Sequence, residues 1–74
     1  MTVTPIIHRQ NAVPFEPYKI LLADGRDLLV KHPDFASVSE EEESITTFDE
    51  NGGVEIVDLA LVVSLQYREP NKTI

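Results

Sequence analysis

The sequence predicts a mainly β domain, a small barrel of five bent strands preceded by a short N-terminal helix. Short apolar runs recur between residues 18 and 67, tight-turn sequences separate them, and 74 residues are too few for an ordinary two-sheet sandwich. Bending one sheet into a barrel hides its edge strands and creates one core. We expect one domain over 1–74, with a helix or extended arm over 1–17, the barrel over 18–67 and a frayed tail over 68–74.

The N-terminal segment predicts a helix of two turns over residues 5–12. Thr4 offers a hydroxyl that can cap the start of this helix, and Pro5 suits its first turn. Such a short helix is not stable in isolation, so we expect its isoleucines to dock on the rest of the domain. Pro14 and Pro17 then keep the following chain extended.

The dipeptide Asp24-Gly25 lies between two apolar runs and predicts a β-hairpin. A two-residue loop would bring Asp27 and Lys31 among the core candidates. A three-residue loop, Ala23-Asp24-Gly25, puts the glycine in a left-handed bulge position. We favour the longer loop because it gathers five apolar side chains on one face: Tyr18, Ile20, Leu22, Leu28 and Val30.

The same register places Leu21 and Leu29 on the opposite face of the hairpin, outside the core. Two alternatives remain for what buries these leucines: residues 5–15 of the same chain, or another subunit. Together with His32 and Phe35, the two leucines form the interaction surface that the sequence predicts.

The remaining segments predict alternating strands and turns. The tetrapeptide His32-Pro33-Asp34-Phe35 breaks the second strand, and the four glutamates of 40–43 suit a solvated loop tip. Strand-forming residues occupy the following stretches, of which the first can be only a short strand: 36–39, 44–49, 54–58 and 63–67. A turn with positive φ at Asn51-Gly52, or at Gly52 alone, separates two of these stretches, and 59–62 suits a single 3₁₀ turn or a kinked strand.

The amino-acid composition restricts the kinds of partner and the cellular compartment that we expect for this protein. Cysteine is absent, so disulfides are excluded, and with only His8 and His32 as imidazoles we expect neither a metal nor another cofactor. A net charge of −7 disfavours a nucleic-acid partner, because proteins bind nucleic acids largely through basic side chains. No apolar run is long enough to cross a membrane, and residues 1–10 do not read as a signal peptide, so we expect a cytoplasmic protein.

Three groups of residues invite a chemical interpretation. His32 with Asp34 or Asp58 could act as a general base with an orienting carboxylate, but no serine or cysteine lies in a nucleophile motif. A histidine with a structural role in a turn explains His32 better. The acidic runs 40–43 and 49–53 lack the ligand spacing of a calcium loop, and we interpret them as a solvated loop and a hairpin turn.

A signature of three segments resembles a family of short bacterial proteins to which we attach no activity. It comprises P-F-x-P-[FY]-x-I-x-L-x-D-G-R over 14–26, H-P-[DE]-F over 32–35 and V-D-L over 57–59. The helix followed by bent strands is also similar to Sm-like and SH3-like barrels. Sm-like proteins form rings by pairing edge strands and bind RNA. Their loop patterns are missing from this chain near His32-Pro33 and Asp58-Leu59.

The sequence favours a non-catalytic protein-interaction or accessory module that we expect to self-associate as a homo-oligomer, with another protein as the alternative partner. Two alternatives remain: an Sm-like RNA-binding protein, and a small enzyme built around His32. The RNA-binding alternative requires five basic side chains to form one cluster in space: Arg9, Lys19, Arg26, Lys31 and Arg68.

Overall fold

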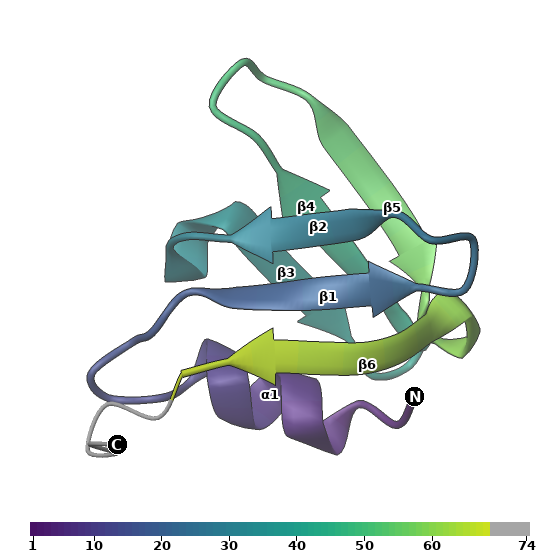
Figure 1. Cartoon of the computed structure of the whole chain (residues 1–74), viewed down its shortest axis with the longest axis horizontal. Helices are drawn as coiled ribbons and strands as arrows, with labels where there is room; N and C mark the ends of the chain where they lie inside the picture. The colour runs from purple at the N-terminus through teal and green to yellow at the C-terminus, as the bar shows by residue number, and fades with distance from the viewer. Residues whose placement is uncertain (69–74) are drawn as a thin grey trace.

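A computed structural model describes residues 1–68, and two three-stranded antiparallel sheets make up most of this part of the chain (Figure 1). The first sheet has the order β2-β1-β6 and the second the order β3-β4-β5. The elements are α1 (Thr4–Gln10), β1 (Tyr18–Leu22), β2 (Asp27–Val30), β3 (Ala36–Ser39), β4 (Ser44–Phe48), β5 (Val54–Asp58) and β6 (Val62–Tyr67). The tail predicted to fray lies, from residue 69 onward, outside the described residues. None of the helices in the described part is long and apolar enough to span a bilayer.

The mainly β class and the N-terminal helix are confirmed, whereas the closed barrel of five strands is wrong. The described chain forms six strands in two sheets that do not close on each other. The 3₁₀ turn Pro33–Phe35 interrupts the chain after β2, so β3 starts in the other sheet and pairs with β4. A second 3₁₀ turn, Leu59–Leu61, carries the chain from β5 back to the first sheet.

The β1–β2 hairpin has the register predicted from its loop. Tyr18 pairs with Val30 and Ile20 pairs with Leu28, as the three-residue loop requires. Gly25 has a φ of 91°, the left-handed conformation of the bulge position. The apolar face of this hairpin therefore points into the core, as expected.

One buried cluster joins the helix to both sheets. Its largest fully buried side chains are Tyr18, Ile6, Ile20, Ile45 and Val30. Since Ile6 shares this cluster with the inward face of β1, the helix lies on the core side of the first sheet. The helix therefore does not cover Leu21 and Leu29, which point to the opposite face. Leu21 is half-buried in its own sheet, and Leu29 is 50% exposed.

Helix α1 is fastened by polar contacts from its C-terminal end. The hydroxyl of Tyr18 donates to Oε1 of Gln10 at 2.7 Å, and Nε2 of Gln10 donates to the carbonyl of Ala36 at 2.9 Å. Gln10 thus bridges β1 and β3, one strand from each sheet. The predicted cap is wrong: Val3 is the N-cap, no side chain caps the helix, and Thr4 is already helical.

Both predicted turns of the second sheet are present. Residues 40–43 form an exposed turn, in which Glu43 has a φ of 51°. The β4–β5 turn is organised by Asp49, whose Oδ1 accepts the backbone N–H groups of Asn51 and Gly53, each at 2.8 Å. Gly52 has a φ of 85°, which agrees with the prediction that a glycine supplies the positive φ.

Candidate protein-binding groove

The open side of the fold forms a groove between the edge strand β2 and the β4–β5 hairpin. Two hollows of about 240 and 300 Å³ lie side by side there, and they share Leu29, Phe48 and Asp49 in their walls. We call this surface the β2 groove. Its apolar lining comes from both sheets and from the 3₁₀ turn between them: Leu28, Leu29, Phe35, Phe48 and Val54. Figure 1 shows the β4–β5 turn projecting past β2, so the hairpin forms one wall of the groove.

Strand β2 presents free backbone groups to this groove. The backbone N–H of Leu22 donates to the carbonyl of Arg26, which identifies that pair as hydrogen-bonded. In an antiparallel ladder hydrogen-bonded pairs alternate with non-hydrogen-bonded ones, so Leu28 bonds to β1 while Asp27 and Leu29 do not. The N–H and C=O of Leu29 therefore point away from β1, and within residues 1–68 no backbone hydrogen bond connects them to the other sheet.

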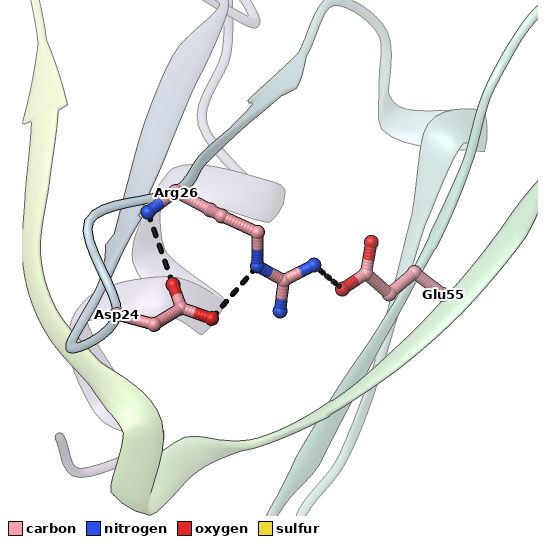
Figure 2. A network of polar contacts seen from close by, with 3 residues as sticks. All are labelled: Asp24, Arg26 and Glu55. Carbon is pink, nitrogen blue, oxygen red and sulfur yellow. Dashed lines mark hydrogen bonds and ion pairs between the residues drawn. The ribbon is translucent and has the colours of Figure 1, made fainter.

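Ion pairs mark the two ends of the β2 groove. Near the β1–β2 turn, Nη1 of Arg26 lies 2.6 Å from Oε2 of Glu55 on β5 (Figure 2). At the other end of β2, Nζ of Lys31 lies 3.3 Å from Oε1 of Glu50 in the β4–β5 turn. All four side chains are more than a third exposed, so each pair contributes little to stability and can open easily.

Arg26 also organises the β1–β2 turn. The carboxylate of Asp24 accepts the backbone N–H of Arg26 at 3.0 Å and its Nε–H at 2.8 Å (Figure 2). These contacts lower the pKa of Asp24 from its ordinary value, the backbone donor first and the guanidinium second. The same carboxylate, followed by Glu55, raises the pKa of Arg26. The guanidinium, which is charged in any case, thus lies between the carboxylates of the turn and of β5.

Negative charge predominates along the groove. Its walls and the ion-pair partners of those walls carry five acids against three bases, Lys19, Arg26 and Lys31. The acids are Asp24, Asp27, Asp49, Glu50 and Glu55. The surface thus adds a local acidic character to a chain whose net charge is −7. An incoming basic segment is attracted by this field, and an acidic one is repelled.

The structure brings together only part of the predicted interaction surface. Leu29 and Phe35 line the same groove, and the ring of His32 lies 6.2 Å from that of Phe35. Leu21 pairs with Ser64 and Asp27 in the middle of the first sheet and lines neither hollow of the groove. Among the described residues, none of the carboxylates makes a hydrogen bond to His32, whose ring instead lies beside Phe35.

Three exposed apolar residues of the β4–β5 hairpin were not predicted from the sequence to form part of a surface. Phe48 pairs with Val54 across the two strands, and Ile56 follows on the same face of β5. They are exposed by 39%, 61% and 70%, respectively. Val54 and Ile56 alternate with Glu55 and buried Val57, so they lie on the face of β5 that is turned away from the core, and the pairing of β4 with β5 places Phe48 beside Val54.

Four of the five basic residues required by the RNA-binding alternative make other contacts in the structure. Lys19, Arg26 and Lys31 each lie within ion-pair distance of a carboxylate, with Asp27 3.7 Å from Lys19. The guanidinium of Arg9 instead lies over the ring of Tyr67, 4.0 Å from its centroid. Within the described residues no group of three or more histidines and acids could hold a metal ion.

Comparisons with known proteins identify no relative of this chain. No family model matches the chain, and neither a curated protein nor a solved structure matches it. The resemblance of residues 14–67 to short bacterial proteins stays a prediction, and so does the similarity to Sm-like barrels.

Proposed function

We propose that the domain is a non-catalytic protein-interaction module that binds its partner in the β2 groove. The single observation behind this proposal is an edge strand with free backbone groups beside an open hollow, whose mainly polar walls also include Leu29, Phe35 and Phe48. Edge strands of stable monomers are generally covered, bulged or charged, because exposed edges pair readily with other chains. Here the edge of β2 lies open next to Leu29, which is half exposed, and Phe48.

Two kinds of partner follow from the sequence, a second copy of the chain or another protein. Charge favours another protein, because two copies that each carry −7 repel one another on approach. The two hollows of the β2 groove are open and small, which suits a macromolecular partner better than a small molecule. Each hollow is at or below the lower end of the range of about 300–1,000 Å³ that is usual for small-molecule sites.

A selection of displayed peptides tests this proposal. Random peptides of about ten residues, the upper range for one strand, are selected on the intact protein and ranked by affinity. We expect ligands whose binding is lost in Phe48→Ser, on the groove, and retained in Val63→Ser, on β6. Both positions are exposed, so neither change should unfold the domain. Failure to select any ligand, or equal loss in both variants, would refute the groove as the binding surface.

Sedimentation velocity of the protein alone tests the other partner. We expect a monomer at micromolar concentrations. A dimer that is lost in Phe48→Ser but not in Val63→Ser would show that a second copy occupies the groove.

A further inference from the structure

We infer that the β2 groove takes an extended, basic segment of another protein, which pairs with β2 as a fourth strand of the first sheet. This inference rests on the proposed function and specifies the partner's conformation and charge. Three features of the groove support it: the spacing of free backbone groups along β2, the position of the hairpin beyond that strand, and the sign of the surrounding charge.

The backbone of β2 fixes the conformation of the ligand. Asp27 and Leu29 both direct their N–H and C=O groups toward the groove, and they are two residues apart. Only an extended chain repeats its own donors and acceptors with this period of two. A helix satisfies its backbone groups internally and has none to offer to β2. Strand addition to an open sheet edge is a general mode of peptide recognition.

The β4–β5 hairpin provides the second wall that an added strand needs. Thr47 and Glu55 lie directly opposite each other on this hairpin, and both line the hollow beside β2. The first sheet has only three strands, and the hairpin extends past its edge (Figure 1). An added strand would therefore be covered by the hairpin on one face, with alternate side chains facing the hairpin and the others lying beside Leu29 on the outer face.

The charge of the groove sets the composition of the ligand. Glu55 and Glu50 are held by Arg26 and Lys31 at the two ends of the groove, through exposed ion pairs. A lysine or arginine of the ligand can replace either partner at small cost, since such pairs are weak. An apolar side chain of the ligand suits the position beside Leu29, where aliphatic cross-strand pairs stabilise a sheet. The expected ligand alternates aliphatic and basic residues.

The selected peptides test this inference separately from the proposed function. Leu29→Pro removes the N–H that faces the groove without breaking a β1–β2 hydrogen bond, whereas Leu29→Thr keeps that N–H and a strand-forming side chain. For the tightest peptides we expect Leu29→Pro to weaken binding at least about tenfold more than Leu29→Thr does. A difference of this size corresponds to the loss of one hydrogen bond between β2 and the peptide. Circular dichroism of both free variants confirms that each is folded.

Peptide composition and salt dependence complete the test. We expect lysine and arginine to outnumber aspartate and glutamate in the selected sequences, and their affinity to fall as sodium chloride is raised. Replacement of every lysine and arginine of a selected peptide by glutamate should abolish its binding to the protein. Groove-dependent ligands that are acidic or helical, or that bind Leu29→Pro and Leu29→Thr equally, would overturn the inference and leave the proposed function standing.

Discussion

The guanidinium of Arg26 and the carboxylate of Glu55 join the two sheets across 29 residues of sequence, with Nη1 and Oε2 2.6 Å apart. No backbone ladder joins the sheets at this edge in the described part of the chain. The contact is electrostatic and exposed, so it is weak and can open. It therefore connects the two sheets at one end of the β2 groove without closing the groove permanently.

The carboxyl of Asp24 should titrate below the usual aspartate range, and substitution of Arg26→Met should raise its midpoint only in part. The larger cause of the low pKa is the backbone N–H of Arg26, which this substitution retains. Side-chain carboxyl NMR signals followed against pH measure both midpoints. In the wild type, the stabilising contribution is present above the unfolded-state pKa and is lost as the pH falls through the native one. A full return to the usual value would mean that the backbone contact is not formed.

Substitution of Gly25→Ala should destabilise the domain by about 1–2 kcal/mol, because an L-residue resists the left-handed conformation. A Cβ at this position meets no atom within 4 Å, so crowding does not add to the cost. Gly25→Asn should be milder, since asparagine tolerates this conformation better. Urea unfolding of the three proteins checks the order. Equal stability of the alanine variant and the wild type would contradict the bulge.

Substitution of Ile6→Ala should cost about 2–5 kcal/mol, the usual range for a buried isoleucine. Its side chain is fully buried in the core shared by the helix and both sheets. Ile56→Ala removes the same atoms from a side chain that is 70% exposed and serves as the matched control. The free energy of unfolding from denaturant titration should separate the two variants clearly. Similar small effects would mean that α1 is not docked.

The phenol of Tyr18 should ionise only near pH 12, because burial raises its pKa to about 12. Between pH 10 and that value the native state keeps a proton that the unfolded state has released. Stability should therefore fall as the pH rises through this interval. Absorbance near the tyrosinate band, compared with Tyr18→Phe, identifies this transition. If the variant kept the transition near pH 12, the assignment to Tyr18 would be wrong.

Local sequence determined the parts of the fold that depend on neighbouring residues. The dipeptide Asp24-Gly25 and the alternation around it predict the hairpin and its register, because a one-residue slip would turn Leu28 and Val30 out of the core. The glycine at position 52 likewise predicts a turn with positive φ. Such patterns do not report which distant strands pair.

The open architecture and most of the groove depend on those distant contacts. Phe48 lines the groove with Leu29 only because the chain changes sheets at Pro33–Phe35, and no local pattern specifies that change. Of the residues predicted from the sequence to form an interaction surface, Leu29 and Phe35 line the groove, whereas Leu21 lies on the same face as Leu29 but on the central strand, outside both hollows. The apolar side of β5 was overlooked for the same reason.

Residue-resolved amide hydrogen exchange of the free protein tests most directly whether the edge of β2 is open. We expect slow exchange for Leu28 and Val30, whose N–H groups bond to β1, and fast exchange for Leu29 between them. Addition of a selected peptide should slow the Leu29 amide and leave its two neighbours nearly unchanged. Slow exchange of Leu29 in the free protein, equal to that of Leu28 and Val30, would contradict an open edge and with it the binding groove.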